Sequence, residues 1–275
     1  FAVTITAEAG KLAFDFAGTA PQTRGNINMT LNATQAAVIY AIKALLDPEA
    51  PNTQAVIDCV ALTAPLGSVA NAVFPAPVAG RAHTCQRVID VVMGALAPAL
   101  PHLVPDAPNG ANTMAVFSGV DPRSGESYVY LETIGGGAGG RPTKPGKDAV
   151  QTGITNTSNL PVEAIETEYP LMVLEYGLAP GSGGAGLHPG GRGIRRIVKP
   201  VDHHCTFNGV GERFRNPPWG LNGGENGGTG RFAMVSANGE ETPLPGKTGD
   251  RVVQPGGAVL MDSPGAGGWG KAETA

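Results

Sequence analysis

The sequence has 275 residues, a formal net charge of −4 and a pI near 5.7. Its Lys and Arg residues are scattered rather than clustered, so the sequence predicts no basic surface for nucleic acid. No apolar run reaches the length of a membrane span, and no basic start followed by an apolar stretch marks a signal peptide. With 41% hydrophobic residues, the chain can bury one large core or two modest ones.

The three cysteines, Cys59, Cys85 and Cys205, are widely spaced and form no CxxC pair. This usage is typical of free thiols in a reducing compartment rather than of a disulfide framework. We therefore expect a cytoplasmic protein.

At the start of the chain, apolar and polar residues alternate on both sides of a turn at residues 8–11, which predicts a hairpin with one buried face. The chain opens with Phe1, without Met, inside the first of these strands. We therefore expect that an upstream segment has been separated from it and that the apolar face needs a neighbour from that segment. The apolar residues concerned are Val3, Ile5, Phe14 and Phe16.

Two stretches, residues 32–47 and 84–97, have the apolar spacing of helices that pack on a sheet. The first begins at Asn32, with Gln35 at capping-box spacing, and ends at Asp47-Pro48. The second ends before Pro98. Residues 51–77, between the two helices, predict short strands and turns.

The first turn of the second predicted helix carries His83, Thr84, Gln86 and Arg87. The free N–H groups and the positive dipole end of such a turn favour a carboxylate or a phosphate, and Arg87 would add to that attraction. The alternative is structural, with Thr84 capping the helix and Arg87 pairing with an acid of the fold. The sequence does not separate these two interpretations.

After Gly110 the pattern changes to short β-type runs separated by Gly and Pro turns, which favours a sandwich or barrel-like sheet. The expected fold class is α+β. Residues 1–110 would form an α+β part, the C-terminal portion of a larger domain whose start is missing, and residues 111–275 a β-rich part continuous with it. The expected strands are Met114–Val120, Ser127–Ile134, Met172–Tyr176, Ile194–Val198, Phe232–Ser236 and Val259–Asp262.

A glycine-rich stretch follows the predicted strand 127–134 and has five glycines within residues 135–140. Glycines let other groups approach the main chain closely, so the stretch predicts either a sharp corner or a backbone-lined pocket. Short polar side chains at residues 155–159 then supply hydrogen-bond donors and acceptors. Together these segments would form a polar cradle, although a purely structural role for the glycines is the alternative.

Four local motifs resemble known sites but lack their context. Two G-x-G-x-x-G patterns, beginning at Gly135 and Gly181, are followed by prolines where a dinucleotide site needs a helix. Residues 246–248, Gly-Lys-Thr, resemble the end of a phosphate-binding loop, but no helical pattern follows them. Residues 202–205, Asp-His-His-Cys, have metal-ligand chemistry without converging partners, and we expect no metal on this chain.

Eight motifs, spread over nearly the whole chain, occur in an order and spacing that resemble one family. They are residues 15–28 (DFAGTAPQTRGNIN), 84–90 (TCQRVID), 132–139 (ETIGGGAG), 155–157 (TNT), 161–163 (PVE), 181–186 (GSGGAG), 217–221 (PPWGL) and 264–270 (PGAGGWG). The chain resembles the C-terminal half of the hydantoinase B/oxoprolinase, or HyuB-type, subunit found in N-methylhydantoinase, 5-oxoprolinase and caprolactamase. An acetone carboxylase subunit is a more distant relative.

The resemblance implies an ATP-dependent hydrolase of cyclic amides that is active only in a complex. A HyuA-type partner would bind ATP and phosphorylate the amide oxygen, and a divalent metal would sit on the N-terminal half of the subunit, which is absent here. One departure is Gly153, where members often carry His before the Thr-Asn-Thr motif, which puts an acid/base role of this motif in doubt. Two alternatives remain, a noncatalytic docking half and part of an acetone-carboxylase-like ketone carboxylase.

No catalytic residue is assigned from the sequence. The residues expected to bind substrate combine the polar cradle, the start of the second helix and the loop before the first helix. They are Arg24, Asn26, His83, Gln86, Arg87, Glu132, Gly136, Gly137, Asn156, Thr157 and Glu163.

Overall fold

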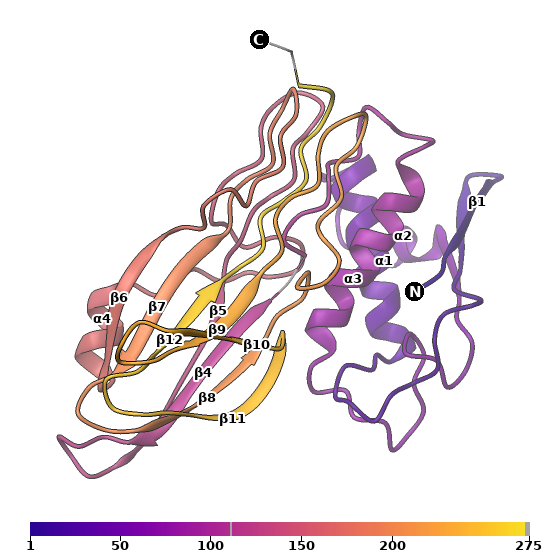
Figure 1. Cartoon of the computed structure of the whole chain (residues 1–275). Coiled ribbons are helices and arrows are strands. Elements are labelled where there is room, and N and C mark those ends of the chain that lie inside the picture. The colour runs from indigo at the N-terminus through magenta and orange to yellow at the C-terminus, as the bar shows by residue number, and fades with distance from the viewer. Residues whose placement is uncertain (111, 273–275) are drawn as a thin grey trace. The chain divides into compact units, whose positions relative to one another are not determined.

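The computed structural model describes residues 1–110 and 112–272. The chain forms two compact units, Phe1–Val104 and Pro105–Ala275, which we call unit 1 and unit 2 (Figure 1). Among the described residues, no helix combines the length and the apolar character needed to span a bilayer.

The predicted N-terminal hairpin is confirmed and opens unit 1. Strands β1 (Thr4–Glu8) and β2 (Lys11–Asp15) pair antiparallel. Ala9 and Gly10 between them both have positive φ, 48° and 77°, as a two-residue hairpin turn requires. Phe14 and Phe16 are only 1% and 0% exposed, so the expectation that these two side chains need an upstream neighbour is wrong.

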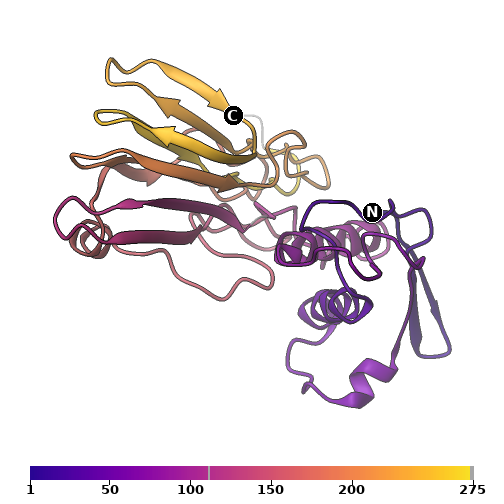
Figure 2. The ribbon, with the colours of Figure 1, turned by 90° about the horizontal axis from the view of Figure 1, so that it is seen from below.

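The two predicted long helices are present in unit 1, and Figure 2 shows them nearly end-on. They pack against each other, a contact that was not predicted. They are α1 (Leu31–Leu46) and α3 (Arg81–Leu96). Helix α3 starts at Arg81, three residues before the predicted start at residue 84, and Gly80 precedes its first turn. The hydroxyl of Thr84 donates instead to the carbonyl of Ile27 at 2.5 Å. The buried apolar residues of α1 and α3 include Ala37, Val38, Ala41, Val88, Ile89 and Val92.

The segment between these helices contains an element that the sequence analysis missed. The short helix α2 (Gln54–Asp58) lies in the stretch that was predicted as strands and turns. It has five residues, none of them buried, and is too short to show a helical apolar period. Strand β3 (Val60–Thr63) follows and pairs parallel to β2. The two strands and the intervening helices therefore form a β-α-α-β crossover.

Unit 2 is a sandwich of two open antiparallel sheets, so the predicted α+β class with a β-rich second part is confirmed. The four-stranded sheet has the order β11-β8-β4-β5 and the five-stranded sheet the order β10-β9-β12-β7-β6. The strands are β4 (Thr113–Val120), β5 (Ser127–Ile134), β6 (Leu171–Leu178), β7 (Ile194–Pro200), β8 (Cys205–Val210), β9 (Arg231–Val235), β10 (Glu241–Leu244), β11 (Lys247–Val253) and β12 (Ala258–Asp262).

The two sheets share one buried core, in which aromatic rings pack among aliphatic side chains. The rings of Phe117 and Phe207 lie 5.1 Å apart on neighbouring strands of the four-stranded sheet. Phe207 meets Phe232, from the other sheet, edge-on at 5.7 Å. These large apolar contacts supply much of the stabilisation of unit 2.

Long glycine-rich loops rise from one end of the sandwich (Figure 1). They bond to one another through the main chain, as where the Gly140 N–H donates to Gly267 O at 2.9 Å. A Cβ atom at Gly139 would lie 1.9 Å from Asp106 O, and one at Gly224 would lie 1.7 Å from Gly268 O. The glycines are therefore required because the loop backbones touch one another.

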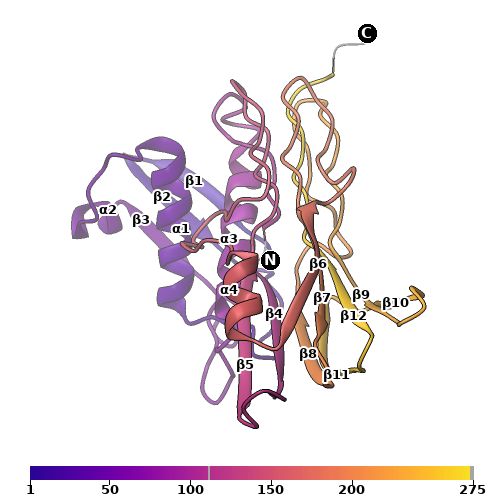
Figure 3. The same cartoon turned by 90° about the vertical axis from the view of Figure 1, so that its left-hand side faces the viewer.

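The run of β-type segments predicted after Gly110 is interrupted by one helix that was not predicted. Helix α4 (Val162–Glu168) packs beside β6 (Figure 3). Its signals are local, with Pro161 just before it and Glu163 in its first turn, and they suffice to predict a short helix. Strands β8, β10 and β11 were also missed. Strands β10 and β11 are edge strands with mostly exposed residues, whereas β8 is an inner strand in which buried and half-buried residues alternate.

Candidate functional site

In unit 1, the loop before α1 is shaped by one buried side chain, Asn28. Its Oδ1 accepts the Thr23 N–H at 2.8 Å, and its Nδ2 donates to Gly25 O and Pro77 O, each at 2.9 Å. This leaves Arg24 and Asn26 exposed on the loop. Asn28 belongs to the motif at residues 15–28, but the sequence did not distinguish its scaffolding role from a binding role.

The same loop lies against the start of α3. The Gly80 N–H donates to Asn26 O at 2.7 Å, and a Cβ at Gly80 would lie 2.9 Å from Asn26 Oδ1. His83 and Gln86 are buried on α3, with 7% and 1% exposure. The structure therefore brings the predicted residue Asn26 close to the predicted helix start.

Arg87 has a partner inside its own helix. Its Nη2 lies 2.5 Å from Asp90 Oδ2, and Asp90 is nearly fully buried. The spacing of three residues places the two side chains on the same side of α3. Of the two interpretations of Arg87, the structure contains the ion pair with an acid of the fold.

In unit 2, Glu132 is the centre of a buried network at the end of β5. Its Oε2 contacts the Tyr130 hydroxyl and Arg196 Nη1, and its Oε1 accepts the Leu160 N–H at 2.7 Å. The guanidinium of Arg196 also lies 4.1 Å from the ring centroid of Tyr176. Burial, with the Glu132 charge beside it, raises the pKa of Tyr130, which therefore stays protonated.

Arg196 is 1% exposed and remains charged in this network. Burial acts most strongly and against its charge, but the attraction of Glu132, the hydrogen bond to it, and the neighbouring Tyr176 and Tyr130 together leave the pKa of Arg196 above its usual value. Glu132 is therefore engaged in holding strands β5 and β7 and the segment at Leu160 together. Its predicted contact with substrate stays a prediction.

The predicted glycines Gly136 and Gly137 pack against other backbone segments. The N–H and C=O of Gly136 pair with Val150 at 2.9 and 2.8 Å, and the N–H of Gly137 donates to Pro264 O at 3.1 Å. A Cβ at Gly137 would lie 2.0 Å from Gly191 O. Close packing therefore accounts for both glycines, and the N–H groups expected to line a cradle are already bonded.

The exposed members of the predicted set in unit 2 lie on residues 152–161, which we call the polar loop, and on the first turn of α4. Asn156, Thr157 and Glu163 are all exposed there. Asn159 fixes the loop, since its Oδ1 accepts the Gly135 N–H at 2.9 Å, while Glu132 holds Leu160. The buried residue Glu132 thus supports the segment that carries the exposed predicted residues Asn156, Thr157 and Glu163. The polar loop and α4 form the candidate site of unit 2.

Asp106 is a carboxyl group that the sequence analysis missed. It is 1% exposed, its Oδ1 accepts the Leu221 N–H at 2.5 Å, and its Oδ2 is buried without a hydrogen-bond partner among the described residues. Burial raises its pKa to about 7, although the bond from Leu221 acts in the opposite direction. Nothing in the local sequence marks this residue, because its environment comes from segments far along the chain.

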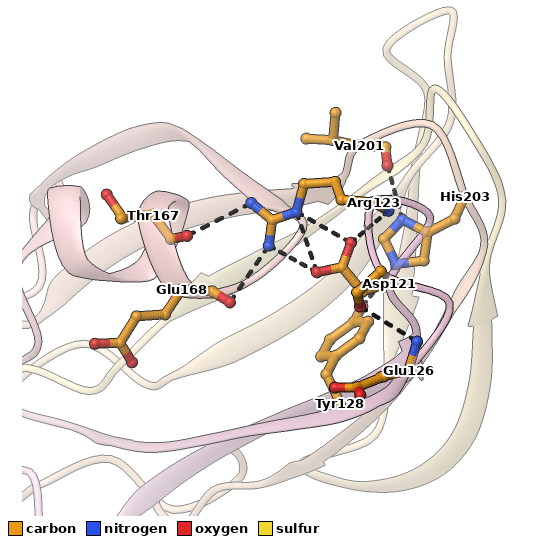
Figure 4. Close-up of polar contacts among 9 residues, drawn as sticks. Asp121, Arg123, Glu126, Tyr128, Thr167, Glu168, Val201 and His203 are labelled. Carbon is orange, nitrogen blue, oxygen red and sulfur yellow. Dashed lines mark hydrogen bonds and ion pairs between the residues drawn. The ribbon is translucent and has the colours of Figure 1, made fainter.

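A second cluster that the sequence analysis missed lies at the turn between β4 and β5 (Figure 4). Arg123 binds Asp121 with two parallel bonds, Nε to Oδ1 at 3.0 Å and Nη2 to Oδ2 at 2.7 Å. The same guanidinium reaches the carbonyl oxygens of Thr167 and Glu168 at the C-terminal end of α4, at 3.5 and 3.3 Å. A cation at the C-terminus of a helix is stabilising, so the cluster fixes α4 against this turn.

His203, from the Asp-His-His-Cys run at residues 202–205, completes the cluster in Figure 4. Its Nδ1 is 2.8 Å from Val201 O, so it must carry a proton that it donates, and Nε2 of the neutral ring then accepts from the Tyr128 hydroxyl at 2.7 Å. Burial raises the pKa of Cys205 to about 11. Across residues 1–110 and 112–272, no three His, Cys, Asp or Glu side chains converge to hold a metal ion.

Solved structures with the same fold belong to large ATP-dependent and carboxylating enzymes. The crystal structure of an ATP-dependent caprolactamase from Pseudomonas jessenii matches 98% of this chain with a TM-score of 0.87 and 23% identity, and the match covers 48% of that chain. An acetone carboxylase matches 98% of this chain with a TM-score of 0.84 and 15% identity, over 41% of that chain. At these identities the matches establish the fold alone.

The family follows from sequence. The chain belongs to the Hydantoinase B/oxoprolinase family, whose profile matches residues 1–272. It is 35% identical to 5-oxoprolinase 1 of Arabidopsis thaliana over 98% of its length and 20% of that protein. It is also 35% identical to the B-type subunit of a putative D-/L-hydantoinase from a Pseudomonas species, over 98% of its length and 46% of that protein.

A third relative, an uncharacterized protein of Methanocaldococcus jannaschii, is 38% identical over 95% of this chain and 45% of its own length. This chain therefore spans less than half the length of these relatives.

Proposed function

We propose that this chain is part of an ATP-dependent hydrolase of cyclic amides, such as a hydantoin, 5-oxoproline or a lactam, and that it supplies polar groups that bind the ring. The observation that carries the proposal is the polar loop, on which Asn156 and Thr157 are exposed while Asn159 is bonded to Gly135 at the loop base. Two relatives are named as a 5-oxoprolinase and as part of a putative hydantoinase, which supports this substrate class.

The chemistry of the polar loop suits such a ring. A cyclic amide presents a carbonyl acceptor and an N–H donor, and the carboxamide of Asn156 can donate to the first and accept from the second. Glu163 adds a carboxylate acceptor in the first turn of α4. Arg24, in unit 1, is exposed, and a guanidinium of this kind can pair with a carboxylate or a phosphate.

Ring opening needs an activated amide, because an unstrained amide is a poor electrophile. In the proposed reaction, a HyuA-type partner binds ATP and phosphorylates the amide oxygen, which turns it into a good leaving group. A divalent metal that activates water would be held by the N-terminal half of the family-length subunit. The donor set of the described residues does not fit such a metal.

The test is reconstitution of the family-length subunit with its ATPase partner and assay of ring opening with ATP. We expect turnover only from the full set with ATP, and none from the 275-residue chain alone. Replacing Asn156→Ala should then lower kcat/KM by about tenfold, the effect of one lost hydrogen bond to substrate, while the assembly stays intact by size-exclusion chromatography.

Asn238→Ala is the matched control, because Asn238 is an equally exposed asparagine in the turn between β9 and β10. Ring opening by the isolated chain, or by the full set without ATP, would refute the mechanism. Unchanged kinetics in Asn156, Thr157 and Glu163 variants of an intact assembly would indicate a docking half instead. A requirement for bicarbonate and a ketone would indicate the carboxylase alternative.

A further inference from the structure

A basic cavity lies in unit 2, away from the polar loop in sequence. It has a volume of about 370 Å³ and is formed by residues 211–216, which follow β8, by residues 245 and 246, between β10 and β11, and by Lys247, the first residue of β11. Three cationic side chains, Arg213, Arg215 and Lys247, line it with a single carboxylate, Glu212. Because the whole chain carries a net charge of −4, this is a local excess of positive charge.

The wall that carries the two arginines is anchored. The Phe214 ring occupies the space that three glycines leave, since Cβ atoms at Gly211, Gly230 and Gly246 would lie 2.2, 2.6 and 2.8 Å from it. The ring also packs 4.7 Å from that of Phe232 in the core. Residues 213 and 215, on either side of this anchor, are therefore held in place without depending on a bound ligand.

Arg213 adopts a backbone conformation that favours glycine. Its φ is 59°, and its side chain is 9% exposed, with Nη1 donating to Pro217 O at 3.2 Å. A side chain with a Cβ is strained in this region, and such residues concentrate at functional sites. An arginine where glycine would fit without strain points to a use for its charge.

The cations of the cavity differ in their partners, and Arg213 is hydrogen-bonded within the fold. Lys247 Nζ lies 2.7 Å from Glu212 Oε1, so this lysine is paired. Arg215 is exposed and makes no hydrogen bond or ion pair with the part of the chain that the structure describes. Its planar guanidinium can bind an oxyanion with two parallel bonds.

We propose that the basic cavity binds the oxyanion group, phosphate or carboxylate, of a small molecule. A volume of this size is within the range of small-ligand sites, roughly 300–1,000 Å³. The site is not a nucleotide loop, because Lys247 begins strand β11 rather than a helix. This anion site goes beyond the proposed function. Its test measures anion binding and not turnover, so the anion site and the proposed function can each be disproved independently of the other.

The test is calorimetric titration of the 275-residue chain with inorganic phosphate, pyrophosphate and succinate at fixed ionic strength. We expect saturable binding of one anion per chain, and the preferred probe distinguishes a phosphate from a carboxylate ligand. Arg215→Gln should weaken that binding about tenfold, because a charge-assisted hydrogen bond is lost. Arg213→Gly should also weaken it, and its urea midpoint reports the balance between the backbone strain that glycine relieves and the lost hydrogen bond to Pro217 O.

Lys144→Gln is the control, since Lys144 is an exposed lysine outside the cavity and the substitution removes the same charge. Its affinity for the preferred anion should equal that of the parent chain. The proposal is wrong if none of the three anions binds saturably. It is equally wrong if Lys144→Gln weakens binding as much as Arg215→Gln, because the effect would then be general screening of net charge.

Discussion

At the scale of single residues, two of the carboxyl groups that unit 2 buries have opposite electrostatic settings. Glu132 faces the cation Arg196, so its negative charge is compensated inside the protein. Asp106 has one hydrogen bond and no cation, and its second oxygen is buried without a partner among the described residues. An uncompensated buried charge is costly, so only the neutral form of Asp106 fits its surroundings well.

The stability of unit 2 should therefore depend on pH through Asp106. Its pKa is about 7 in the folded chain, against 3.8 for an exposed carboxyl of this type. Because the folded-state pKa is raised, the unfolded chain ionises first, and stability falls as the pH rises from about 4 to 7. Each tenfold change in the dissociation constant is about 1.4 kcal/mol, so the loss is on the order of 4 kcal/mol.

Asp106→Asn removes this ionisation, so the variant should be more stable than the parent chain at pH 8 and differ less at pH 4. Urea unfolding at both pH values measures the effect. Asp148→Asn is the control of opposite sign: burial acts to raise the pKa of Asp148, but bonds from Arg192 outweigh it and lower that pKa. A parent chain whose advantage over Asp106→Asn grows with pH would contradict the assignment.

At the scale of elements, the glycine-rich loops behave as a packed layer built from backbone. Main-chain hydrogen bonds join segments far apart in sequence, such as Gly137 to Pro264 and Gly184 to Ala266. The distances between these segments leave no room for side chains at several positions. This layer supports the polar loop, because Gly135, at its edge, bonds to Asn159.

Gly137→Ala should therefore destabilise unit 2 by about 3 kcal/mol or more, because the new methyl group would lie 2.0 Å from Gly191 O and the backbone must move. Gly177→Ala is the matched control, since no atom lies within 4 Å of a Cβ at that strand position. Its effect on the free energy of unfolding should stay within about 0.5 kcal/mol. Equal urea midpoints for the two variants would show that the loops are not closely packed in solution.

At the scale of the whole molecule, the chain covers 45% and 46% of the lengths of two relatives.

We predict that the 275-residue chain holds no stoichiometric divalent metal. Both ring nitrogens of His203 are hydrogen-bonded, and the pKa of Cys205, raised to about 11, keeps its thiol protonated at neutral pH. Elemental analysis after dialysis against zinc and manganese is the measurement. One tightly held ion per chain would overturn the prediction.

The sequence by itself determined the elements whose side chains carry a clear periodic pattern. Alternation at residues 4–15 predicted the hairpin, and apolar spacing predicted α1 and α3 to within three residues. The order of eight motifs indicated the family, because spacing over the whole chain carries more information than one local pattern. Each of these signals lies in neighbouring residues, where local geometry dictates which side chains share a face.

Only the tertiary structure decided what the singled-out residues contact. Glu132 meets Arg196, Gly137 meets Gly191, and Asp106 meets Leu221, all across long separations in sequence. A glycine that turns a corner and one that lets two backbones touch look alike in sequence. Likewise, a carboxylate next to a glycine loop suggests a ligand site until its buried partner is known. Burial and pairing depend on which distant segments fold together, and no local pattern encodes that choice.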